Sequence, residues 1–116
     1  MKNFKFEQIT ECKEDGEINL DRVIIEIYFK RTDKRSNLYH MEFNCETMND
    51  MHISIIKSPY QILCEYLNYN EVHLKNHFAK HYECKLYNHH YCFPGHQIEK
   101  IIQWFETFKV MKELVK

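Results

Sequence analysis

The segment LDRVIIEIYFKR, residues 20–31, decides the fold. Successive side chains of a β-strand point to opposite faces, and this segment alternates at that period. One face is wholly apolar and is formed by Val23, Ile25, Ile27 and Phe29. The other face is mixed and is formed by Ile24, Glu26, Tyr28 and Lys30. This pattern predicts a central strand of an antiparallel sheet that is packed on one side and partly solvated on the other.

The flanking segments predict three more strands. Residues 38–45 alternate in the same way and follow the short polar turn 32–37, which predicts a hairpin. Residues 3–11 also begin as a strand, but their alternation loses its phase near Ile9, which indicates a bulge. Met51, Ile53 and Ile55 alternate with polar side chains, so we expect a fourth strand there, although Ile56 also allows an early helix.

Three helices are expected in the second half of the chain. Ser58 followed by Pro59 is a helix start, because the hydroxyl caps free amides and proline fits the first helical position. Apolar residues then recur at helical spacing through about Asn68. Asn70 can cap a second helix, whose pattern continues to about Asn88, and the break at 93–95 precedes a last helix over residues 96–116.

Strands followed by helices predict the α+β class. We expect an antiparallel sheet of about four strands in the N-terminal half, packed against about three helices in the C-terminal half. A chain of 116 residues with 44% hydrophobic residues has the size and composition of a single domain, residues 1–116.

The segment 73–96, HLKNHFAKHYECKLYNHHYCFPGH, is the richest in side chains that can bind metal. Histidines recur there every four residues, but a helix rises about 1.5 Å per residue, so the whole row is too long to hold one ion. Neighbouring pairs on either side of the chain break could instead form a zinc clasp at a corner between two helices. The set with suitable spacing is His81, Cys84, Cys92 and His96.

Two other interpretations of this segment stay open. Histidine at the margin of a core and cysteine within it are often packing residues without any ligand. A catalytic interpretation would pair Cys92 as nucleophile with His89, His90 or His96 as base. No glycine-rich phosphate loop or nucleophile elbow accompanies these residues, so the sequence favours this interpretation least.

Two groups of polar residues are candidates for contact with a partner. His73 and His77 lie on the expected boundary stripe of the second helix, outside the zinc set. Lys34 and Arg35 stand at the expected hairpin tip, where basic residues also serve to block pairing between strand edges. Acidic residues crowd the first loop instead, so the two loops give the surface a dipole suited to steering a protein.

Composition favours a small binding protein. The formal net charge of −1 provides no general attraction for nucleic acid, and no apolar run is long enough for a signal peptide or a membrane span. Five cysteines, an odd number, fit free thiols or metal ligands in the cytoplasm. We therefore expect a non-enzymatic protein of the inhibitor, immunity or accessory type that binds another protein. The alternatives are a zinc-stabilised domain that contacts nucleic acid and a cysteine- or metal-dependent hydrolase.

Overall fold

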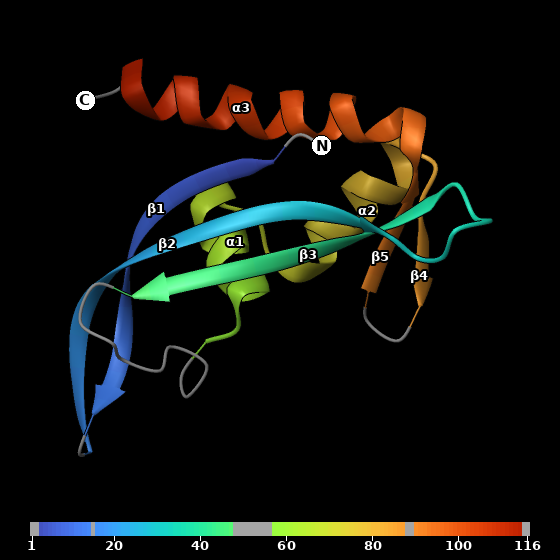
Figure 1. The fold of residues 1–116 in the computed structure, drawn as a ribbon. Coiled ribbons are helices and arrows are strands. Elements are labelled where there is room, and N and C mark those ends of the chain that lie inside the picture. Colours follow the sequence, from blue (N-terminus) through green and yellow to red (C-terminus); the bar gives the residue numbers. More distant parts are fainter. Residues whose placement is uncertain (1–2, 15, 48–56, 88–89, 115–116) are drawn as a thin grey trace.

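The protein has an α+β fold, as the sequence predicts. The computed structural model describes residues 3–14, 16–47, 57–87 and 90–114, and within them five strands form one antiparallel sheet and three helices pack against it (Figure 1). The strands are β1 Phe4–Glu14, β2 Glu17–Arg31, β3 Leu38–Thr47, β4 Lys85–Tyr87 and β5 His90–Pro94. The helices are α1 Pro59–Leu67, α2 Glu71–His81 and α3 Ile98–Leu114.

The first three strands form a continuous meander within the strand order β1-β2-β3-β5-β4. Pairing of β1 with β2 runs unbroken from Phe4↔Ile27 to Glu14↔Glu17. The bulge expected near Ile9 is therefore wrong, because Ile9 keeps its register and points to the side of the sheet opposite Phe4 and Phe6. The strand expected at residues 51–55 lies outside the described residues.

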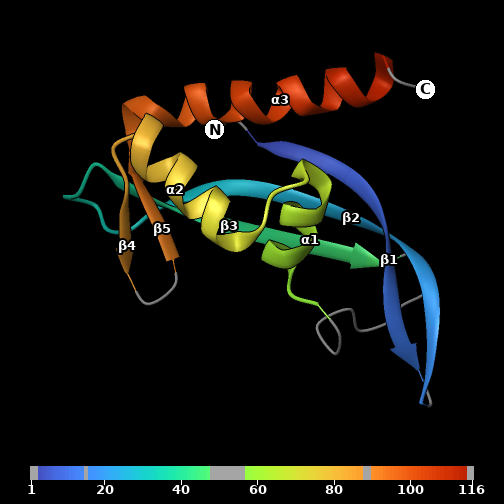
Figure 2. The same ribbon diagram turned by 180° about the vertical axis from the view of Figure 1, so that it is seen from behind.

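One face of the sheet carries the hydrophobic core. The four apolar side chains of the central strand are at most 1% exposed, as their alternation predicts. α1 and α2 lie behind this face, and α3 runs beside α2 and the start of β1 (Figures 1 and 2). No helix of the described chain covers the opposite face, which we call the open face. No helix of the described residues has the length and apolar character needed to cross a bilayer.

The first helix begins where its capping residues predict. The Ser58 hydroxyl accepts a hydrogen bond from the Gln61 amide at 3.2 Å, and the Gln61 side chain accepts one from the Ser58 amide at 2.9 Å. This reciprocal pair satisfies two amides that a helix start leaves open. The helix ends at Leu67, and the capping residue Asn68 adopts a left-handed conformation with φ of 60°.

The second helix is shorter than the sequence predicts. Asn70 caps it as expected, accepting a hydrogen bond from the His73 amide at 2.8 Å, but the helix ends at His81. Tyr82 is extended, and the chain then forms the hairpin of β4 and β5. The expected continuation of this helix to Asn88 is wrong. β5 pairs with β3, with Tyr39 opposite Phe93, and β4 pairs with β5. This long-range pairing holds residues 85–87 in a strand in place of a helix.

The last helix begins close to the expected position. A turn of 3-10 helix at Gly95–Gln97 leads into α3, and the Gly95 amide donates to the Asn37 carbonyl at 2.9 Å. This bond joins the start of α3 to the β2–β3 turn. Phe105 then anchors the helix on the sheet, since its ring stacks on Phe4 with centroids 5.4 Å apart.

Candidate functional site

The four residues of the expected zinc clasp are not assembled into one ligand group. Cys84 packs towards the hydrophobic core, whereas Cys92 faces the other side of the hairpin, with its sulfur 3.7 Å from His40 Nδ1. His96 Nε2 lies 3.6 Å from a carboxylate oxygen of Glu83, and His81 is exposed at the end of α2.

The two cysteines lie on opposite faces because of strand register. Lys85 pairs with Cys92, so Cys84, one residue earlier, has the opposite orientation. Among the described residues, no three His, Cys, Asp or Glu side chains are grouped closely enough to hold a metal ion. The zinc clasp stays a prediction, to be tested by metal analysis of protein purified without a histidine tag.

The thiols of this hairpin are enclosed and protonated. Burial raises the pKa of Cys84 to about 11, with the nearby Cys92 sulfur adding to the effect, and burial also raises the pKa of Cys92. Cys92 is fully buried beside His40, whose ring meets that of His90 edge-on at 5.9 Å. A thiol held neutral and covered in this way has the surroundings of a packing residue, because the thiolate is the nucleophile.

The histidines of α2 have different environments. His73 is exposed, as a contact residue needs to be. His77 is half-buried, and its ring stacks on Trp104 of α3 with centroids 4.0 Å apart. The His77 ring also meets Tyr69 edge-on at 6.0 Å and lies 4.6 Å from the His81 ring. His77 therefore helps to join α2 to α3, and of the expected pair His73 is the more accessible to a partner.

The surroundings of His77 predict a dependence of stability on pH. Burial, and then the positive charge of His81, lower the pKa of His77 below its ordinary value of 6.5. The unfolded chain therefore binds a proton at a higher pH than the folded chain does. The stability that the neutral His77 provides is complete above about pH 6.5 and decreases as the pH falls below that value.

The change His77→Phe keeps an aromatic ring against Trp104 and removes the titrating group. We expect urea unfolding to show a smaller loss of stability between about pH 7 and about pH 5.5 in His77→Phe than in the original protein. His73→Gln, one turn earlier on the exposed side, is the control and should keep the original pH dependence. Identical pH profiles for His77→Phe and the original protein would contradict this role of His77.

The basic tip of the β2–β3 hairpin forms as expected. Lys34 and Arg35 are exposed there, and Asp33 Oδ1 orders the turn by accepting from the Arg35 and Ser36 amides, both at 2.7 Å. Arg31 lies over the Tyr39 ring at 5.4 Å. The tip lies beside the β4–β5 hairpin, and the acidic β1–β2 turn lies at the other end of β2 (Figure 1).

The far end of the β1–β2 hairpin is the surface that the sequence did not reveal. Residues 9–14 and 17–22, which we call the arm, extend beyond α1 and away from the helices (Figures 1 and 2). Ile9, Ile18 and Leu20 share the open face of the arm and are 63%, 65% and 69% exposed. The side chains of Ile9 and Leu20 are diagonal neighbours, because Ile9 pairs with Arg22. These residues form an aliphatic patch, the arm patch.

Outside the arm, the open face of the sheet carries polar side chains that form hydrogen bonds with one another. Glu26 accepts hydrogen bonds from Asn3 and, at 3.0 Å, from Asn44. The bond from Asn44 is the main cause that lowers the pKa of Glu26. On the same face, the bond between Tyr28 and Glu42 raises the pKa of Tyr28. Among the described residues of this face, the large exposed aliphatic side chains are those of the arm patch.

A shallow pocket of about 440 Å³ lies between α1, α2 and the β4–β5 hairpin. In it the hydroxyls of Tyr60 and Tyr91 are 2.8 Å apart, and burial with this hydrogen bond raises the pKa of Tyr60. Burial raises the pKa of the neighbouring Cys64 to about 11. These groups are neutral at physiological pH, so they provide hydrogen bonds and no charged nucleophile.

Comparison with protein-family models, with curated proteins and with solved structures finds no match to this chain.

Proposed function

We propose that the protein binds another protein through the arm patch and acts as an inhibitor, immunity or accessory factor. The observation that carries this proposal is the exposure of Ile9, Ile18 and Leu20 on one face of a projecting hairpin. Apolar side chains exposed together on a protein surface often mark an interaction site. Covering Ile18 and Leu20 in an interface would contribute roughly 1.5–3 kcal/mol for each side chain.

Strand pairing fixes the backbone of the arm, so the arm patch has a defined shape. Both of its strands pair in register up to Glu14↔Glu17, so their backbone is held by hydrogen bonds. A paired hairpin loses less conformational freedom on binding than an unstructured loop does, and preorganisation of this kind increases affinity. The patch thus combines apolar area with a fixed shape.

The charges around the patch indicate the chemistry of the partner. Glu11 lies on the same face as the patch and is exposed, whereas Glu7 is engaged with Arg22 at 3.9 Å and the register places Glu17 on the opposite face of the arm. A carboxylate beside an apolar patch repels phosphate and attracts basic side chains. The partner that fits is a protein whose surface has an apolar area and a basic side chain placed to meet Glu11.

The free thiols support a cytoplasmic location for the protein. Cys64, Cys84 and Cys92 are free thiols. Free thiols persist in reducing compartments. A partner in the same compartment is therefore the one to seek.

Photocrosslinking in the native host tests the proposal. A benzophenone amino acid at position 20 should give one discrete adduct with a second protein. The same amino acid at position 114, where Leu114 is 78% exposed on α3, is the matched control and should not give that adduct. Equal adducts from both positions, an adduct with the mass of two copies of this chain, or no adduct from position 20 would overturn the proposal.

A further inference from the structure

Within the described part of the chain, no strand pairs with the outer edge of β1. β1 stands at one end of the strand order, and a strand at the edge of a sheet presents unpaired backbone groups. The Lys5 carbonyl points outward, since it accepts a hydrogen bond from Lys109 Nζ of α3 at 3.4 Å. In an antiparallel pair both backbone groups of a residue point to the same side, so Lys5 and Glu7 present an amide and a carbonyl to this edge.

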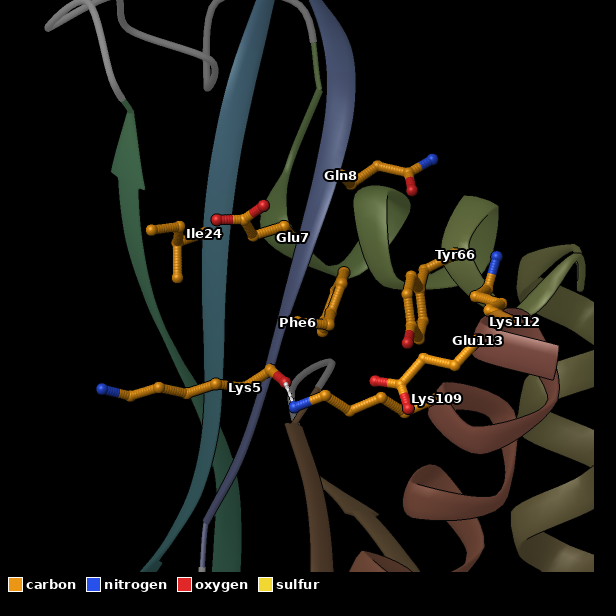
Figure 3. A pocket seen from close by; sticks show the side chains of 9 residues that line it. All are labelled: Lys5, Phe6, Glu7, Gln8, Ile24, Tyr66, Lys109, Lys112 and Glu113. Atoms are coloured by element: carbon orange, nitrogen blue, oxygen red, sulfur yellow. Dashed lines mark hydrogen bonds between the residues drawn. The ribbon is translucent and has the colours of Figure 1, made fainter. Parts of the chain in front are cut away.

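A cleft of about 500 Å³ accompanies this edge. Phe6 and Tyr66 form its apolar side, with ring centroids 4.2 Å apart, and the last turns of α3 form the opposite wall (Figure 3). Figure 3 shows Lys109 reaching across the cleft to β1. The cleft therefore has room next to backbone groups that could pair with an incoming chain, and the rings of Phe6 and Tyr66, 3% and 5% exposed, form part of its lining.

The charged side chains of the cleft indicate the charge of the chain that would bind there. Lys112 Nζ lies over the Tyr66 ring at 4.4 Å, and Lys109 Nζ contacts a backbone carbonyl; neither contact neutralises the ammonium charge. Lys5 and Glu7 also line the cleft, but they pair with Glu26 and Arg22, each at 3.9 Å. Glu113 is the remaining acidic residue of the lining. The wall formed by α3 thus carries two ammonium groups and one carboxylate, so its net charge is positive and favours an anionic ligand.

We propose that the cleft between β1 and α3 binds an extended acidic segment of another protein, which pairs with β1 as an added strand. An amide of the segment takes the place of Lys109 Nζ on the Lys5 carbonyl. The ammonium groups of Lys109 and Lys112 then bind carboxylates of the segment, while its apolar side chains lie against Phe6 and Tyr66. This site is separate from the arm patch and does not depend on it.

A peptide titration followed by NMR tests the proposal. The probe is a peptide of about ten residues, the length of a strand, that alternates two valines with two glutamates, so that each of its faces carries both residue types. We expect it to shift the amide resonances of Lys5 and Glu7. The same peptide with lysine in place of glutamate should bind at least about tenfold more weakly, as should a peptide with proline at two central positions, which cannot donate backbone hydrogen bonds.

Substitutions in the protein complete the test. The double change Lys109→Gln and Lys112→Gln should weaken binding of the glutamate peptide about tenfold. Lys109→Arg with Lys112→Arg should retain it, because the positive charges remain. Lys75→Gln with Lys80→Gln, on exposed positions of α2, is the matched control and should have no effect.

Three results would overturn the proposal. One is the absence of binding up to about 1 mM peptide. Another is equal affinity for the glutamate, lysine and proline peptides. The third is a dimer of this chain, seen by sedimentation, that protects the β1 amides, because a second copy would then occupy the edge.

Discussion

Replacing Phe78 by alanine is expected to lower the free energy of unfolding by about 3–5 kcal/mol. Phe78 is fully buried, and its ring meets those of Tyr91 and Phe93 edge-on at 5.0 and 5.4 Å. It also contacts Trp104 and Phe105 of α3. The change would leave a cavity where α2, α3 and β5 meet, and none of these rings can fill it without losing its own contacts.

Urea unfolding followed by circular dichroism measures this effect. The matched control is Val72→Ala, because Val72 lies on the same helix and is 65% exposed. Its effect should stay within about 0.5 kcal/mol. If Phe78→Ala cost no more than this control, the convergence of α2, α3 and β5 on Phe78 would be wrong.

Phe105→Ala is expected to have the second largest effect, also about 3–5 kcal/mol. Phe105 is fully buried and is the residue through which α3 stacks on Phe4 of β1. Loss of its ring should loosen α3 from the sheet as well as destabilise the core. Hydrogen exchange should therefore show faster exchange in α3 than in β2 when the variant is compared with the original protein.

Val110→Ala provides the control for this change. Val110 lies on the same helix and is 53% exposed, so its replacement should leave both stability and exchange nearly unchanged. A uniform increase of exchange over the whole chain in Phe105→Ala, without preference for α3, would show that Phe105 is not the specific anchor of that helix.

Elements with strong local signals could be predicted from the sequence. The alternation of residues 23–29 specified a strand with one buried face, and the structure buries that face completely. Ser58 and Pro59 specified the start of α1, where the expected cap forms with Gln61. In both cases the determining interactions lie within a few residues of one another, so local periodicity and capping chemistry were sufficient.

The β4–β5 hairpin could not be predicted in the same way. β4 is three residues long, too short for alternation to distinguish it from a helix end. β5 forms because it pairs with β3, which lies about fifty residues earlier in the sequence. Leu86, which falls within the expected range of the second helix, is instead 44% exposed on β4.

The surroundings of the candidate site residues could not be predicted for the same reason. The zinc hypothesis assumed a corner between two helices, whereas the hairpin register turns Cys84 and Cys92 to opposite faces. The contact of Cys92 with His40 depends on the pairing of β3 with β5, which local patterns do not reveal. The arm patch depends on where the helices end relative to the sheet, and only the assembled fold shows that the arm extends beyond them and that Ile18 and Leu20 are exposed.

The most direct test of the central claim is the affinity of the crosslinked partner for three forms of this protein, measured by isothermal titration calorimetry. The forms are the original protein, Leu20→Lys and the control Leu114→Lys. We predict that Leu20→Lys binds at least about thirtyfold more weakly, as expected for a residue at the centre of an interface, with an unchanged unfolding temperature. Leu114→Lys should bind like the original protein. Equal affinity of all three forms would contradict the assignment of the arm patch as the docking surface.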